Sequence, residues 1–132
     1  MKKQINHVKR FHEVYEAPIL EKPGIPSKER MQLRHKLLSE ELGEYEEACA
    51  NNDLVEISDS LVDLAYILFG TVLEHGLQDK FEAMFEEVQR SNMSKLDRNG
   101  QPIKREDGKI LKGPDFFLPN LQAILQEESV QI

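Results

Sequence analysis

Five glutamates crowd the stretch SEELGEYEEACA, and they do not fall on the same side of a helix. With about 100° of rotation per residue, Glu41 lies near the centre of the apolar face and Glu44 lies about 60° away, still inside that face. Glu40 sits at the edge, whereas Glu46 and Glu47 fall on the far face, where charged side chains are ordinarily solvated. A carboxylate inside an apolar stripe is costly unless it is paired or binds a metal.

Two basic residues lie near the same stripe, so two kinds of partner remain open for its acids. Glu41 and Glu44 are three residues apart, so their side chains leave the helix together, and two unpaired carboxylates at this spacing repel. The arrangement indicates either a cation between them or ion pairs with Arg30 and Arg34. The spacing alone favours neither alternative.

A second group of acids follows on the next predicted helix. Glu56, Asp59 and Asp63 occur at i, i+3 and i+7 and therefore share one narrow strip. Taken alone, such a strip is typical of a solvated polar face. Here, however, Leu64 and Ile67 flank the far side of the strip, so apolar residues border it on both edges.

The break between these two helices is about three residues long, which predicts antiparallel packing. Antiparallel packing brings both groups of acids to similar depth, most naturally with Glu44 opposite Asp59. Four or five carboxylate oxygens would then converge on one place. Hard oxygen ligands without His or Cys suit Mg²⁺, or Mn²⁺, far better than Zn²⁺, and such sites normally hold phosphate oxygens as well.

The elements that must position these acids are helical. Turn signals at Asn99-Gly100 and Asp107-Gly108 predict one small hairpin, with Ile103 facing Ile110 or Leu111. We therefore predict an all-α fold, an antiparallel bundle of four to five helices with a small C-terminal β-hairpin. Ser27 and Asp53 are the expected N-caps of the second and third helices. Apolar periodicity places the helices at residues 4 to 16, 27 to 50, 54 to 75, 78 to 91 and 120 to 127.

Composition narrows the classes of protein. The chain has 132 residues, which fits one domain, and its net charge of -7 argues against nonspecific binding to nucleic acid. No apolar run is long enough for a transmembrane helix, and the N-terminus lacks the apolar core of a signal peptide. The single cysteine, Cys49, excludes an internal disulfide and favours a cytoplasmic setting. We expect Cys49 to be a packed core residue and the four histidines to be structural or surface residues.

The acids also carry a family resemblance. The pattern E-E-x-x-E at Glu40, Glu41 and Glu44, followed by E-x-x-D at Glu56 and Asp59, resembles the all-α nucleotide pyrophosphohydrolase superfamily. That superfamily includes MazG-type enzymes, dimeric dUTPases and phosphoribosyl-ATP pyrophosphohydrolase.

The resemblance covers residues 30 to 97, and the segments SNMSKLD and NGQPIKREDGKILKGPDFF resemble a small phosphoribosyl-ATP pyrophosphohydrolase-like subgroup. We expect one domain over residues 1–132, with a core at 28–97 and a hairpin and tail at 98–132.

The resemblance implies that Glu41, Glu44, Glu56 and Asp59 hold Mg²⁺, with Asp63 as a further ligand or a partner of one. It also implies hydrolysis of a nucleoside triphosphate between the α and β phosphates, giving the monophosphate and pyrophosphate. Members of the superfamily assemble as dimers or tetramers, so a homodimer or homotetramer is expected.

Other residues receive roles on the same resemblance. Glu40 and Glu44 are both candidates for activating the attacking water. Asn92 and Lys95, placed after the fourth predicted helix, are candidates for contacting phosphate or sugar, because a lysine supplies a compact charge for phosphate. The basic hairpin could cover the triphosphate or simply protect an exposed edge.

Four alternatives stay open at this point, three of them enzymes. A broad nucleoside triphosphatase, a dUTPase-like enzyme and a phosphoribosyl-ATP-specific enzyme differ in pocket shape, which the sequence does not reveal. Outside the enzyme class, the chain would be a non-catalytic helical oligomer. Its acids would then form ion pairs between subunits with Arg30, Arg34 and the hairpin lysines.

Overall fold

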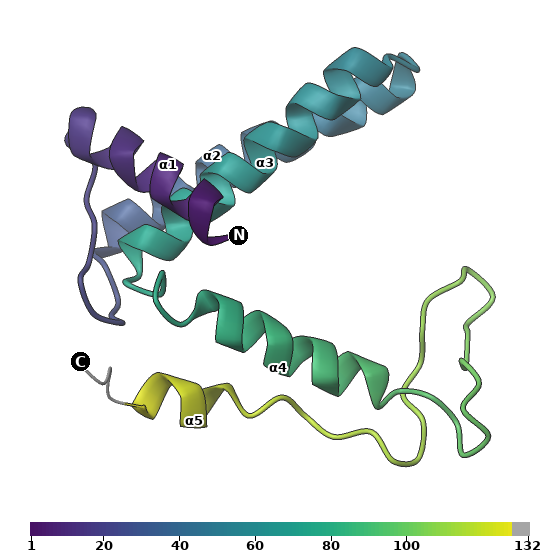
Figure 1. The fold of residues 1–132 in the computed structure, drawn as a ribbon. Helices are drawn as coiled ribbons and strands as arrows, with labels where there is room; N and C mark the ends of the chain where they lie inside the picture. The colour runs from purple at the N-terminus through teal and green to yellow at the C-terminus, as the bar shows by residue number, and fades with distance from the viewer. Residues whose placement is uncertain (128–132) are drawn as a thin grey trace. The chain divides into compact units, whose positions relative to one another are not determined.

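The first of two units into which the chain divides, Met1–Asp79, consists of three helices (Figure 1). The computed structural model describes residues 1–127, and this unit holds α1 (Lys2–Val14), α2 (Lys28–Ala50) and α3 (Leu54–Glu74). The short connection after α2 forces the antiparallel packing of α2 against α3 that the sequence predicts. α1 packs against α3.

Side-chain caps fix where α2 and α3 begin. Ser27 Oγ accepts a hydrogen bond from the Arg30 backbone N–H at 3.3 Å, and Asp53 Oδ1 accepts one from the Glu56 N–H at 3.2 Å. Both caps are as predicted. α3 ends before Gly76, whose φ of +67° is in the left-handed region. A Cβ there would lie 2.0 Å from the Lys22 carbonyl oxygen, so the passing loop also requires glycine.

The core of this unit is small and apolar. Ile5 and Val8 of α1 are buried together with Val72 and Leu73 of α3, and Ala48 of α2 is buried as well. The connection between α1 and α2 is fastened to the end of α3 by backbone hydrogen bonds, including Leu20 N–H to the Leu73 carbonyl at 3.1 Å.

A buried ion cluster joins the start of α2 to the end of α3. Glu74, 1% exposed, receives Arg30 Nε on Oε1 at 2.9 Å and Arg34 Nη1 on Oε2 at 3.1 Å. Arg34 also donates from Nη2 to the Ile67 carbonyl at 2.7 Å and from Nε to Thr71 Oγ1 at 3.1 Å. These contacts set one antiparallel register between α2 and α3.

The second unit, residues 80–132, contains α4 (Phe81–Met93) and α5 (Leu121–Gln126). The chain returns beside α4 in the opposite direction, held by Ser91 Oγ donating to the Phe117 carbonyl at 2.8 Å and Asn120 N–H donating to Glu87 Oε1 at 3.1 Å. Lys80 Nζ donates to the Ile124 carbonyl at 2.8 Å and so caps the last turn of α5.

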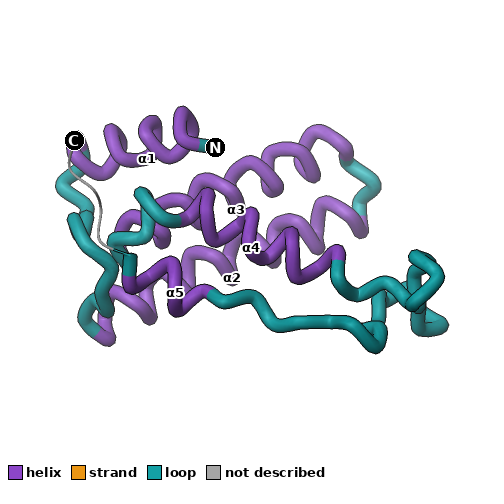
Figure 2. The backbone as a smooth tube through the Cα atoms, turned by 60° about the horizontal axis from the view of Figure 1, so that its bottom comes forward, coloured by secondary structure: helices purple, strands orange, loops and turns teal. Residues whose placement is uncertain are grey.

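The segment predicted as a β-hairpin forms no strands, as Figure 2 shows, so that prediction is wrong. A single antiparallel bridge pairs Lys104 with Ile110. The turns themselves form, because Asp97 Oδ1 accepts from the Gln101 N–H at 2.9 Å and Asp107 Oδ1 accepts from the Lys109 N–H at 3.1 Å. Such local side-chain bonds compete with a ladder, and an isolated two-stranded ladder has little stability.

The all-α prediction is confirmed, with five helices among residues 1–127. None of these helices combines the length and apolar character needed to cross a membrane.

Candidate functional site

Three carboxylates meet between α2 and α3. Glu41 and Glu44 of α2 and Asp63 of α3 each offer one oxygen, and these oxygens lie within 4.8 Å of one another. Glu41 and Asp63 are half-buried, and Glu44 is exposed. Two neighbouring helices therefore direct acids to one place, which a divalent cation would fit.

One oxygen of the cluster has no partner. Glu41 Oε2 is buried and accepts no hydrogen bond. A buried acceptor left in this state is costly, because it has lost its water without gaining a donor. The observation fits a metal ligand, since a hard carboxylate oxygen is the donor that Mg²⁺ or Mn²⁺ prefers.

The charges of the cluster repel one another. Burial raises the pKa of Glu41, and the neighbouring Glu44, Asp63 and Asp59 carboxyl groups raise it further. Burial also raises the pKa of Asp63, and Asp59 and Glu44 add to the effect. The carboxylates of both helices therefore repel one another electrostatically, and a cation bound among them would reduce this repulsion.

The arginines near the α2 stripe are engaged elsewhere. Arg30 and Arg34 both pair with Glu74, and within residues 1–127 neither forms an ion pair with Glu41 or Glu44. Intramolecular pairing with these arginines, which the sequence left open, is therefore not what accommodates the cluster. The buried oxygen of Glu41 remains without a donor.

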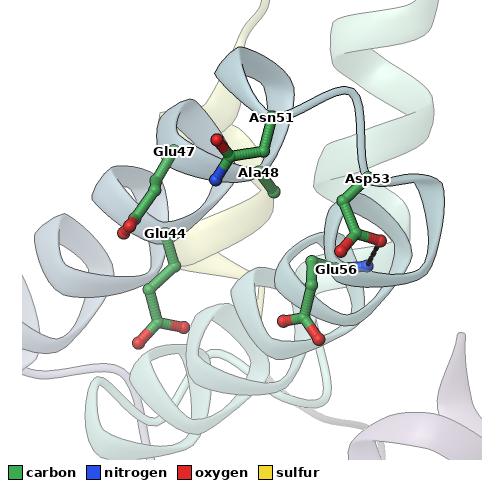
Figure 3. A pocket seen from close by; sticks show the side chains of 6 residues that line it. All are labelled: Glu44, Glu47, Ala48, Asn51, Asp53 and Glu56. Carbon is green, nitrogen blue, oxygen red and sulfur yellow. Dashed lines mark hydrogen bonds between the residues drawn. The ribbon is translucent and has the colours of Figure 1, made fainter.

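An open hollow of about 370 Å³ continues from the cluster towards the α2–α3 turn. Glu44 and Glu56 stand on facing helices beside it (Figure 3), and Asp53, which caps α3, also lines it. The acid Glu47 and the amide Asn51 also line its α2 side. Glu47 is exposed, as its angle on the helix predicts, but that angle does not reveal that it also lines a hollow.

The remaining acids lie around this centre. Asp59 is exposed, yet it is close enough to raise the pKa of Glu41 and of Asp63. Glu40 is exposed and lies outside the group whose oxygens meet. Of the two candidates for activating water, only Glu44 therefore belongs to the close cluster.

Asn92 and Lys95 lie in the second unit and line one hollow of about 400 Å³. Met93, Leu96 and Ile110 contribute its apolar wall. Asn92 belongs to the last turn of α4, not to the following loop as expected, because α4 continues to Met93.

The prediction that Cys49 is a packed core residue is wrong, since Cys49 is exposed.

A family model described as phosphoribosyl-ATP pyrophosphohydrolase matches residues 8–92, a span that includes all of α2 and α3 and every acid of the candidate site. The comparison with curated proteins found no match.

Proposed function

The chain belongs to the phosphoribosyl-ATP pyrophosphohydrolase family, within the MazG-like all-α pyrophosphohydrolases, and from this premise we propose a Mg²⁺-dependent nucleoside triphosphate pyrophosphohydrolase. Membership assigns the chain to hydrolases that act on acid anhydrides of nucleotides. The proposal adds the metal, the bond and the substrate class. Cleavage would fall between the α and β phosphates.

The observation that carries the proposal is the convergence of Glu41, Glu44 and Asp63 around a buried oxygen that has no partner. We assign these three carboxylates to cation binding, with Glu56 and Asp59 as further ligands. When bound, Mg²⁺, or Mn²⁺ in its place, neutralises phosphate charge and acidifies a coordinated water. The charge of the site then suits a triphosphate, although the chain carries a net charge of -7.

In the proposed reaction a water oxygen bonds to phosphorus while the bridging P–O bond between the α and β phosphates breaks. The water proton passes to a carboxylate. Attack on the α phosphorus expels pyrophosphate with the bridging oxygen, and attack on the β phosphorus expels the monophosphate with that oxygen. Glu44 is the exposed member of the cluster and can accept this proton. Glu40, one turn earlier on the rim, is the alternative base.

Asn92 and Lys95 are proposed to contact phosphate or sugar. Lys95 is a compact positive charge on the wall of a hollow that also offers an amide and apolar side chains. That combination suits a ligand with an anionic and a flat apolar part. We further propose a homodimer or homotetramer, located in the cytoplasm.

Phosphoribosyl-ATP is the second candidate substrate, because the matched family is described by that compound. Its hydrolysis would break the same kind of α–β linkage, so the catalytic residues keep their roles. A dUTPase-like preference is the remaining alternative.

A nucleotide panel tests the proposal. The common ribonucleoside and deoxyribonucleoside triphosphates, dUTP and phosphoribosyl-ATP are each incubated with the protein and Mg²⁺, and pyrophosphate and orthophosphate are assayed separately. We expect pyrophosphate as the first product and the monophosphate beside it. Orthophosphate as the first product, or no turnover of any compound, would overturn the proposed cleavage.

A further inference from the structure

Gly70, near the C-terminal end of α3, lies where side chains of two other helices pack against the backbone. A Cβ at this position would lie 2.5 Å from Arg34 Nη2 of α2 and 2.8 Å from His12 Nε2 of α1. Both neighbours are buried. Glycine weakens a helix interior, so its presence here indicates that the space above residue 70 is needed for the guanidinium and the imidazole.

Arg34 cannot easily move aside, because each of its three guanidinium nitrogens contacts an acceptor. Its three nitrogens reach Glu74, the Ile67 carbonyl and Thr71 Oγ1, each at 3.1 Å or less. Arg30 holds the same Glu74 carboxylate from the previous turn of α2, with two hydrogen bonds of 2.9 and 3.0 Å. A planar guanidinium presents its donors in a fixed fork, so this group fixes direction as well as distance.

These contacts and the acid cluster both lie along the line of contact between α2 and α3, which we call the α2–α3 seam. Along α2, Glu41 follows Arg34 by seven residues, and along α3, Asp63 precedes Gly70 by seven residues. Seven residues are about two turns, so both pairs repeat on the facing sides of the antiparallel helices. A slip of one residue would move a carboxylate by about 1.5 Å along the axis and rotate it by about 100°.

Buried ion clusters are often a poor source of stability and are better known for fixing register. We propose that Arg34, Glu74 and Gly70 are positioning residues for the metal centre. They set the register of α2 against α3, and this register brings the oxygens of Glu41 and Asp63 together. The inference rests on the proposed function, because it concerns cation binding between those acids.

Manganese affinity of the full-length protein tests the inference without an activity assay. The fraction of free Mn²⁺ is measured by electron paramagnetic resonance for the wild type, Gly70→Ala and Arg34→Lys, at a temperature where circular dichroism shows each to be folded. Gly70→Ala displaces the guanidinium without changing any charge. Arg34→Lys keeps the charge and loses the fork. We expect Mn²⁺ binding to be about tenfold weaker in both variants. This is the lower end of the losses in metal affinity that follow when a residue that orients a metal ligand is replaced.

A matched control separates positioning from general destabilisation. Val8→Ala removes buried methyl groups from α1, where the side chain is 2% exposed, and so lowers stability away from the α2–α3 seam. We expect it to melt earlier and to bind Mn²⁺ as the wild type does. Because Gly70→Ala and Arg34→Lys disturb one contact, the double variant should bind about as weakly as the weaker single variant.

Each outcome points to a different conclusion. If the wild type and all three single variants bind Mn²⁺ equally, the positioning role is overturned and the proposed function stands. If Val8→Ala weakens binding as much as Arg34→Lys, the effect is general loss of stability and the positioning role is again overturned. If the wild type itself binds no Mn²⁺, the proposed metal centre fails, and the positioning role fails with it.

Discussion

At the scale of single residues, Glu41 makes the metal-free protein sensitive to pH. Its pKa is raised in the folded state by burial and by neighbouring acids, so the folded state holds the proton more tightly than the unfolded state. The resulting stability is fully present below about pH 4.3, the ordinary pKa of glutamate, and is lost as pH rises through the raised value. Asp63 acts in the same direction.

Glu41→Gln should therefore stabilise the metal-free protein at neutral pH. In EDTA at pH 7.5 we expect a melting temperature roughly 3 to 5 °C above that of the wild type, the shift for about 1 kcal/mol in a chain of this size. The difference should shrink towards pH 4, where the wild-type carboxyl is protonated. Calorimetry across this range measures it, and a difference that grows towards low pH would contradict the assigned charge state.

Addition of Mg²⁺ should reverse that order. A ligand that binds only the folded state raises the melting temperature, by about 2.7 kcal/mol of stability at a hundredfold excess over the dissociation constant. We expect this rise in the wild type and in Glu46→Gln, whose residue is exposed outside the cluster. Glu41→Gln and Asp63→Asn should lose most of it. An equal rise in all four proteins would place the cation elsewhere.

The choice between Glu40 and Glu44 as base can be settled by kinetics. General base catalysis contributes about 10²- to 10⁴-fold, so replacing the base by glutamine should lower kcat by at least about 10²-fold. Because Glu44 lies in the close cluster, we expect Glu44→Gln to show this loss together with weaker Mn²⁺ binding. Glu40→Gln should retain Mn²⁺ binding. A drop in kcat of Glu40→Gln alone would assign the base to Glu40.

Residue types and their angular spacing predicted which acids meet at the site. They did not predict which acid the arginines pair with. The position of Glu41 inside an apolar face follows from the wheel, and the structure does place it beside Glu44 and Asp63. The sequence did not identify Glu74 as a partner, although it lies one helical turn after Gly70. Which acid Arg34 meets depends on the axial register of two helices. An angular projection contains no axial information, so the ion pair could not be predicted.

At the scale of secondary-structure elements, the first turn of α3 connects helix capping to the site. Asp53 caps that turn and lines the hollow that Glu44 and Glu56 share. Asp53→Ala should lower stability by about 1 kcal/mol, the usual cost of a lost N-cap. Because fraying of this turn also moves Glu56, the Mg²⁺-induced rise in melting temperature should become smaller.

Asn120→Ala is the matched control, since Asn120 caps α5 in the second unit by accepting from the Ala123 N–H at 3.2 Å. It should leave the Mg²⁺-induced rise unchanged. Thermal denaturation with EDTA and with Mg²⁺ compares the two variants. A full rise in Asp53→Ala would show that Glu56 is not a ligand.

The helices were more predictable than the hairpin for a physical reason. Caps, apolar periodicity and helix-breaking residues act within a few positions of the chain, so Ser27 and Asp53 could be identified before any packing was known. A ladder needs a partner strand and a face to bury. Ile110 and Leu111 have exposed side chains, so the turns near Asn99 and Asp107 form without a sheet between them.

At the scale of the whole molecule, α3 carries an apolar strip that the other helices of the first unit leave exposed. Leu54, Leu61 and Leu68 follow one another at seven-residue intervals and are 73%, 51% and 43% exposed. Ser58 and Ala65, both small, lie between them on the same face. Large residues at heptad spacing with small residues between them suit close packing against another helix.

We expect this strip to pack against a second copy of the chain, in line with the proposed homodimer or homotetramer. Leu61→Glu would place a charge in that contact and leave it without a partner. Sedimentation equilibrium should therefore show an oligomer for the wild type and a monomer for Leu61→Glu at the same concentration. Lys36→Glu, which changes charge at an exposed position of α2, should remain oligomeric. A wild type that is monomeric at its highest soluble concentration would show that the exposed leucines form no contact between copies. A Leu61→Glu variant that forms the same oligomer as the wild type would show the same.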